Sequence, residues 1–223
     1  MKQLFKHSSL RDNRKGICGL HVLVDDGNWR NTLIDQAKSA LRGGANVLQL
    51  RTKVSTDIDV LKWSKALRNL TRLNNKLFFV NDRFDIALAS EADGVHLGQE
   101  DISPTMIPIN IRERLLIGRS THNIEQVTKA KKDNVDYIAF GPIFSTTTKL
   151  SSFTERGITY LKDAVAAASP IPVIAIGGIN CDNVSTLSAG GAQGFAVISE
   201  IANSPNPVDT TKQLIAKFSS RVK

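Results

Sequence analysis

Cysteine, tyrosine and tryptophan are scarce in this 223-residue chain, which has two of each. Cys18 and Cys181 lie far apart, and neither has neighbours with metal-ligand spacing. We therefore expect free thiols in a reducing cytosol rather than a disulfide scaffold. The shortage of large aromatic residues, together with the lack of a long Lys/Arg run, argues against a nucleic-acid partner.

Apolar stretches long enough to span a bilayer are also lacking, and the first fifteen residues have no apolar segment typical of a secretory signal. We therefore expect a cytoplasmic protein with no membrane partner. The formal net charge is +8, which is compatible with a substrate that carries several phosphates. A basic, solvated exterior accounts for much of this charge. A homo-oligomer is possible, but no sequence pattern specifies the oligomeric state.

Short apolar runs alternate with amphipathic segments eight times along the chain. Both kinds of segment are bounded by Gly, Pro, Asn and Asp, which mark turns. The runs predict strands at residues 20–24, 47–50, 77–80, 94–97, 115–118, 137–140, 173–176 and 194–198. The amphipathic segments predict helices at residues 32–42, 58–73, 84–89, 104–112, 124–132, 159–168, 182–189 and 208–221.

This alternation predicts an α/β fold, a (β/α)₈ TIM barrel in a single domain over residues 1–223. Residues 1–16 are polar and form a lead-in, and residues 17–223 form the barrel. The alternative is an open doubly wound sheet. It is disfavoured because no Gly-x-Gly-x-x-Gly segment follows the first strand. In a barrel, the chemistry is expected at the carboxyl ends of the strands.

The last two predicted strands both end in a phosphate-binding pattern. Gly177 and Gly178 follow one strand, and their backbone N–H groups can approach a ligand closely. Ser199 follows the other strand, at the start of a short helix. Phosphate sites of barrels lie after strands seven and eight. We therefore predict a phosphate site here, the alternative being a tight turn at the glycine pair.

The second strand ends in Gln49, Arg51 and Lys53, which share one side of the chain because strand side chains alternate. An amide with two cations suits a diphosphate. The next two strands end in Asn81–Asp82 and in a segment that contains Asp101. Carboxylates beside a diphosphate site indicate Mg²⁺, which shares its oxygen ligands with phosphates. Each Asp suits a helix N-cap equally well.

Polar residues also follow the fifth and sixth strands. Ser120 and His122 can bind ligand or shuttle protons, or can cap the next helix. His96 lies inside a strand and is expected to be a packed histidine. Three threonines and Lys149 lie on a long loop over residues 141–156, which suggests a phosphate-gripping lid, the alternative being a surface loop.

Taken together, the residues predict one barrel with a monophosphate site and a diphosphate–Mg²⁺ site. Such a pair suits the joining of two phosphorylated molecules with loss of diphosphate. The chain also resembles the thiamine-phosphate synthase family, from the first strand to the last. The resemblance lies in the order and spacing of LQLRTK, VNDRFDIALA, ADGVHLGQED, GRSTH, DYIAFGPIFSTTTK, PVIAIGGIN and GFAVISEI.

The resemblance implies the coupling of 4-amino-2-methyl-5-hydroxymethylpyrimidine diphosphate with a thiazole phosphate, carboxylated or not, to give thiamine phosphate and diphosphate. It implies that the pyrimidine diphosphate is held by Gln49, Arg51, Lys53, Asn81, Ser120 and Lys149. It implies that one Mg²⁺ is held by Asp82 and Asp101. For the thiazole phosphate it implies Thr146, Thr148, Gly178, Ile198 and Ser199.

The implied mechanism is dissociative: diphosphate leaves first, and the thiazole nitrogen captures a resonance-stabilised pyrimidine cation. Arg51, Lys53, Ser120 and Lys149 are then the catalytic residues, because they stabilise charge on the leaving group. No protein nucleophile is needed. Three segments depart from the family pattern: Thr52 replaces a Glu, residues 21–26 read HVLVDD where LYLVTD is frequent, and residues 150–156 are atypical.

Two alternative functions are compatible with the same fold. A thiazole tautomerase shares this barrel and would use His122 as an acid–base residue, but it needs neither a diphosphate site nor Mg²⁺. A non-catalytic phosphate-binding barrel is the other alternative. Arg51, Lys53, Asp82 and Asp101 favour the synthase over both.

Overall fold

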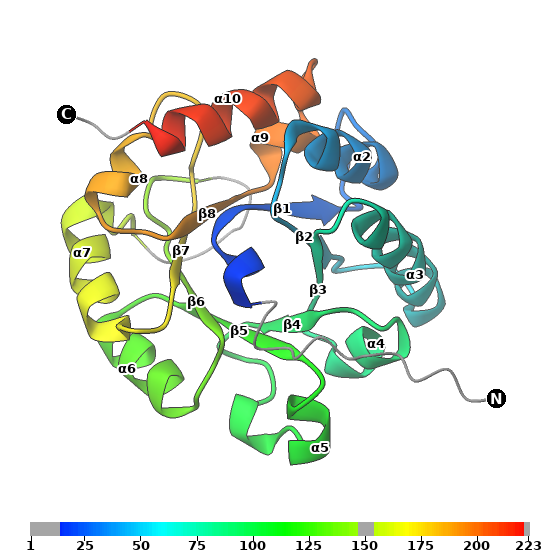
Figure 1. Ribbon diagram of the computed structural model, residues 1–223, viewed down its shortest axis with the longest axis horizontal. Coiled ribbons are helices and arrows are strands. Elements are labelled where there is room, and N and C mark those ends of the chain that lie inside the picture. Colours follow the sequence, from blue (N-terminus) through cyan, green and yellow to red (C-terminus); the bar gives the residue numbers. More distant parts are fainter. Residues whose placement is uncertain (1–13, 147–153, 221–223) are drawn as a thin grey trace.

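Eight parallel strands close into a barrel in the computed structural model, which describes residues 14–146 and 154–220 (Figure 1). The strands pair in chain order, and β1 pairs with β8 to close the ring. They are β1 Gly19–Asp25, β2 Val47–Arg51, β3 Leu77–Asn81, β4 Gly94–Leu97, β5 Leu116–Thr121, β6 Tyr137–Phe140, β7 Val173–Ile176 and β8 Gly194–Val197. The predicted TIM barrel is therefore confirmed.

Helices surround this ring of strands (Figure 1). They are η1 Arg14–Ile17, α2 Leu33–Gly43, α3 Asp57–Leu73, α4 Phe84–Ala89, η2 Pro104–Met106, α5 Ile109–Arg112, α6 Ile124–Lys132, α7 Gly157–Ala168, α8 Thr186–Ala189, α9 Ser199–Ala202 and α10 Pro207–Ser219. Within the described ranges, no helix combines the length and the apolar composition that crossing a bilayer requires.

Local chemistry sets the ends of the longer helices. Thr32 and Thr56 precede α2 and α3, and their hydroxyl groups accept hydrogen bonds from backbone N–H groups in the first turn. Gly44 ends α2 with a φ of 102°, a conformation that glycine adopts without a side-chain clash. These signals explain why both helices agree with their predicted bounds to within one residue.

Two predicted helices are shorter in the structure. Residues 182–189 were expected to be helical, but α8 begins only at Thr186. The side chain of Asn180 accepts hydrogen bonds from the N–H groups of Asp182 and Asn183, and this local turn competes with the helix. Residues 104–112 divide into η2 and α5 because Pro108 disfavours helical geometry at Ile107 before it.

The apolar core has two parts. The larger part lies between the strands and the surrounding helices. The smaller part fills the inside of the barrel and includes Phe79, Leu116, Tyr137 and Ile174. Ile17 of η1 is fully buried against this inner cluster, and η1 lies at the middle of the ring of strands (Figure 1). The lead-in was predicted over residues 1–16, of which residues 1–13 lie outside the described part of the chain.

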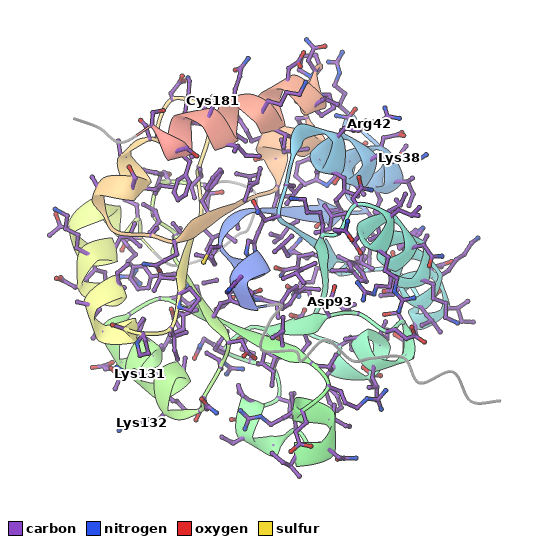
Figure 2. The ribbon with its side chains drawn as sticks, in the orientation of Figure 1. Lys38, Arg42, Asp93, Lys131, Lys132 and Cys181 are labelled. Carbon is purple, nitrogen blue, oxygen red and sulfur yellow. The ribbon has the colours of Figure 1, made fainter. Side chains whose placement is uncertain are left out.

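Much of the positive charge lies on the outer surface. Lys38 and Arg42 extend outward from α2, and Lys131 and Lys132 extend outward from α6 (Figure 2). All four side chains are exposed. The expected basic, solvated exterior is therefore present, and it is separate from the strand ends.

Candidate active site

A cavity of about 750 Å³ is lined by the residues at and after the carboxyl ends of the strands. Eleven of the thirteen residues predicted for the site line it: Gln49, Arg51, Lys53, Asn81, Asp82, Asp101, Ser120, Thr146, Gly178, Ile198 and Ser199. The other two, Thr148 and Lys149, lie outside the described residues. The fold therefore brings both predicted anion sites into one cavity.

Gln49, Asn81 and Asp82 form a connected hydrogen-bond chain across the ends of β2 and β3. The Gln49 amide donates to Asn81 Oδ1, and the Asn81 amide donates to Asp82 Oδ1. Gln49 is buried, whereas Asn81 and Asp82 are partly exposed to the cavity. The amide side chains therefore hold the Asp82 carboxylate in place at the mouth of the barrel.

Asp82 occupies an unusual backbone conformation, with a φ of 66°. Its N–H donates to the carbonyl oxygen of His96 on β4, which fixes the turn that follows β3. Lys53 Nζ lies 2.7 Å from Asp82 Oδ2. A strained residue held by neighbouring strands is typical of a functional site.

Asp101 lies next to Asp82, and the two carboxyl groups are hydrogen-bonded. Asp101 also accepts a 2.6 Å hydrogen bond from the N–H of Gly98. Burial and then the neighbouring Asp82 carboxyl raise the pKa of Asp101. Burial opposes ionisation of Asp82 as well, but hydrogen bonds from Lys53 and Asp101 lower its pKa overall. Two carboxyl groups sharing a site in this way favour a bound cation.

The alternative role of these carboxylates, helix capping, is not observed. Helix α4 begins after Arg83, which makes no side-chain cap, and η2 begins after Ser103. In the parts of the chain that the structure covers, no three His, Cys, Asp or Glu residues gather into a group that could hold a metal. Asp82 and Asp101 therefore fit a cation that takes its remaining oxygen ligands from phosphate and water, as Mg²⁺ does.

Asp25 is a site residue that the sequence reasoning missed. It ends β1 next to Arg51 at the end of β2, and it is 6% exposed. Its Oδ2 atom lies 2.5 Å from Arg51 Nη1, and its Oδ1 atom accepts hydrogen bonds from the Gly27 N–H and the Trp29 indole. The signal that could have found it is its position, since Asp25 and Arg51 directly end neighbouring parallel strands.

Two histidines and a serine line the wall formed by β4 and β5. His96 is 5% exposed, so the expected packed histidine is confirmed, but it also faces the cavity. Its Nε2 atom lies 2.8 Å from Ser120 Oγ. His122 Nδ1 donates a 2.6 Å hydrogen bond to the Gly141 carbonyl. The N-cap of α6 is Asn123, so neither Ser120 nor His122 caps this helix.

The opposite wall is built from β7, β8 and the chain after β6. Gly177 and Gly178 have φ angles of 101° and 63°, which other residues adopt with strain. A Cβ atom at Gly178 would overlap the carbonyl oxygens of Phe144 and Ser145. Glycine therefore lets two backbone segments meet beside the cavity. Ser199 begins α9 on the same wall, as predicted.

The deep end of the cavity is apolar. It is lined by Leu23, Ala139, Ile174, Ile176 and Ala196. The polar groups of the two walls thus lie above a floor that suits flat, uncharged rings.

The family model described as thiamine monophosphate synthase matches residues 20–201. The thiamine-phosphate synthase of Chlorobium phaeovibrioides is 44% identical over 182 residues, which cover 82% of this chain and 87% of that protein. The chain belongs to the thiamine-phosphate synthase family. The family model, this relative and the fold confirm the family, the synthase function and the transferase class predicted from the sequence.

Two further family members extend the comparison. The thiamine-phosphate synthase of Prochlorococcus marinus (strain MIT 9313) is 42% identical over 188 residues, covering 83% of this chain but 52% of that longer protein. The solved structure of thiamine phosphate pyrophosphorylase from Pyrococcus furiosus superposes with a TM-score of 0.84 at 34% identity. It covers 94% of this chain and 99% of that one. The family generally uses Mg²⁺, whereas the ligand roles of individual residues here remain predictions.

Proposed function

We propose that this chain joins 4-amino-2-methyl-5-hydroxymethylpyrimidine diphosphate to a thiazole phosphate, giving thiamine phosphate and diphosphate. The observation that supports this most directly is the pairing of two different anion sites in one cavity. One wall carries Arg51 and Lys53 beside two carboxylates, and the other carries Gly178 and Ser199. A site for one phosphorylated ligand would need only one of these walls.

The pyrimidine diphosphate lies on the wall formed by β2 to β5. Arg51 and Lys53 neutralise its negative charge, and Gln49, Asn81 and Ser120 supply hydrogen bonds. Lys149, outside the described residues, is assigned to the same diphosphate. Because Asp25 already holds the Arg51 guanidinium, this cation is oriented before the substrate arrives.

Asp82 and Asp101 would hold Mg²⁺ between this wall and the diphosphate. Bound there, Mg²⁺ neutralises charge that develops on the leaving oxygens. The shared hydrogen bond between the two carboxyl groups supports this assignment, because a cation replaces the proton that keeps them together. Lys53, paired with Asp82, also lies close enough to move toward the diphosphate.

The thiazole phosphate lies on the opposite wall. The backbone around Gly178 and Ile198, together with the hydroxyl groups of Thr146 and Ser199, provides donors for one phosphate. Thr148 is assigned to the same phosphate and lies outside the described residues. The two rings meet over the apolar floor.

The reaction is dissociative. The bond between the pyrimidine methylene carbon and the diphosphate oxygen breaks, and its electron pair leaves with the diphosphate. The thiazole nitrogen then donates its lone pair to the methylene carbon, forming the new C–N bond. Arg51, Lys53, Ser120 and Lys149 stabilise the leaving group electrostatically. The apolar floor keeps water away from the cation.

Formation of thiamine phosphate tests the proposal. Purified protein is incubated with both substrates and Mg²⁺, and parallel samples contain EDTA, or EDTA followed by excess Mg²⁺. We expect product with Mg²⁺, none with EDTA, and recovery on restoring Mg²⁺. A folded protein that forms no product with both substrates present would contradict the proposed reaction.

A thiazole tautomerase is the second candidate, because the geometry of His122 suits an acid–base residue. His122 Nδ1–H donates to the Gly141 carbonyl, so the neutral ring carries its lone pair on Nε2. Isomerisation of a carboxylated thiazole phosphate, abolished in His122→Ala, would support this candidate. Synthase activity retained in His122→Ala would separate the two functions.

A further inference from the structure

His96, Gly118 and Tyr137 lie side by side across three strands. His96 on β4 is paired in register with Gly118 on β5, and Gly118 is paired with Tyr137 on β6. A Cβ atom at position 118 would overlap the Tyr137 ring. Glycine in the middle strand therefore lets the tyrosine side chain cross β5 and reach the histidine.

The contact continues to the cavity as a chain of hydrogen bonds. Tyr137 Oη lies 2.7 Å from His96 Nδ1, and His96 Nε2 lies 2.8 Å from Ser120 Oγ. Tyr137 is 1% exposed and His96 is 5% exposed, so water does not replace these contacts. The rings of His21 and Phe79 pack edge-on against Tyr137, at centroid distances of 5.3 and 5.5 Å. The phenol therefore has one fixed position.

This geometry decides where the protons lie. A buried hydroxyl must donate its hydrogen or lose a hydrogen bond, and His96 Nδ1 is the acceptor that Tyr137 meets in the described residues. Burial raises the pKa of the Tyr137 phenol, so the hydrogen stays on it. Since Nδ1 accepts, the proton of neutral His96 lies on Nε2 and is donated to Ser120 Oγ.

We propose that Tyr137 and His96 are positioning residues that fix the Ser120 hydroxyl as a donor toward the diphosphate. Because Ser120 Oγ accepts from His96, its own hydrogen is left for a ligand oxygen in the cavity. In the opposite arrangement, Ser120 would donate to His96 and present only lone pairs to an anion. The proposal rests on the proposed function, since that assigns Ser120 to the diphosphate.

The tautomer of His96 is the direct test. We would record ¹⁵N NMR spectra of the full chain without substrate, at a pH where imidazoles are neutral, and assign His96 by comparison with His96→Gln. The expected state in the unmodified protein is protonated Nε2 and unprotonated Nδ1. Protonated Nδ1 would overturn the proposal, and this outcome is decided even if every Tyr137 variant fails to fold.

Tyr137→Phe removes the donor and keeps the ring. We expect its His96 spectrum to shift toward protonated Nδ1, with a loss of kcat of about tenfold and an unchanged KM for the thiazole phosphate. Tyr160→Phe is the matched control, because Tyr160 is the other tyrosine of the chain and lies on α7, away from the cavity lining. It should change neither the spectrum nor kcat.

A double-mutant cycle tests whether Tyr137 acts through Ser120. If it does, Tyr137→Phe lowers kcat alone but not further in Ser120→Ala. Multiplying losses would overturn the proposal, as would an unchanged kcat in Ser120→Ala. If instead the unmodified protein has protonated Nε2 but makes no thiamine phosphate, the proposed function fails while the hydrogen-bond chain stands.

Discussion

Asp25 and Arg51 form an ion pair between the ends of β1 and β2, with Asp25 Oδ2 2.5 Å from Arg51 Nη1. Both side chains are largely buried, 8% and 18% exposed. Asp25 belongs to the HVLVDD segment, which departs from the family pattern. In this chain, an acid on the first strand thus orients a cation of the diphosphate wall.

Asp25→Ala should lower the free energy of unfolding by about 3 kcal/mol, because it leaves a buried guanidinium without its partner. It also removes the acceptor of two further hydrogen bonds, from Gly27 and Trp29. Urea denaturation measures the change. The control is Asp209→Ala, which removes an exposed pair 3.8 Å from Lys212 and should cost under about 0.5 kcal/mol. Equal losses in the two variants would contradict this account.

Asp82→Ala should abolish the part of diphosphate binding that depends on Mg²⁺. Calorimetry with inorganic diphosphate, with and without Mg²⁺, measures this directly. We expect Mg²⁺ to strengthen binding to the unmodified protein by about tenfold or more, and to have little effect on the variant. Asp85→Ala removes an exposed carboxylate three residues away, which is paired with Arg83, and should behave like the unmodified protein. Normal Mg²⁺-dependent binding in Asp82→Ala would refute the metal assignment.

Gly178→Ala should raise the KM for the thiazole phosphate by about tenfold or more and leave the KM for the pyrimidine diphosphate unchanged. The new methyl group would overlap the carbonyl oxygens of Phe144 and Ser145 and shift the wall beside the phosphate. Gly157→Ala is the matched control. Its φ of 70° carries the same backbone strain, but no atom lies within 4 Å of the added methyl group. If both variants raise this KM alike, strain rather than contact is responsible.

His21 should make stability fall in mild acid. Burial lowers its pKa to about 4, with a 2.6 Å hydrogen bond to the Ile17 carbonyl opposing the shift. Between about pH 6.5 and pH 4 the unfolded chain binds a proton at this position and the folded chain does not, so the free energy of unfolding decreases as pH falls. From pH 7.5 to pH 5 this contributes about 2 kcal/mol.

The measurement is urea denaturation at both pH values for the unmodified protein and for His21→Gln. Subtracting the two pH dependences removes the contribution of the other titrating groups. Parallel pH dependences would show that His21 is not buried as a neutral base.

Much of the site could be predicted because parallel strands place all their carboxyl ends at one mouth of the barrel. Once the eight strands were found from their apolar runs, the residues after each strand had to converge. Gln49, Asp101 and Ser199 line one cavity for this reason, although they are far apart in the sequence. The glycine pair at 177–178 was readable because only glycine adopts such backbone angles without strain.

The contacts between strands were decided by the tertiary structure. The ion pair of Asp25 with Arg51 depends on the register of β1 against β2. The reach of Tyr137 to His96 depends on Gly118 lying between them. Side chains on neighbouring strands meet only once the barrel has closed, and no local pattern encodes that register. The sequence by itself therefore determined the fold and which residues enter the cavity, and tertiary packing determined how those residues hold one another.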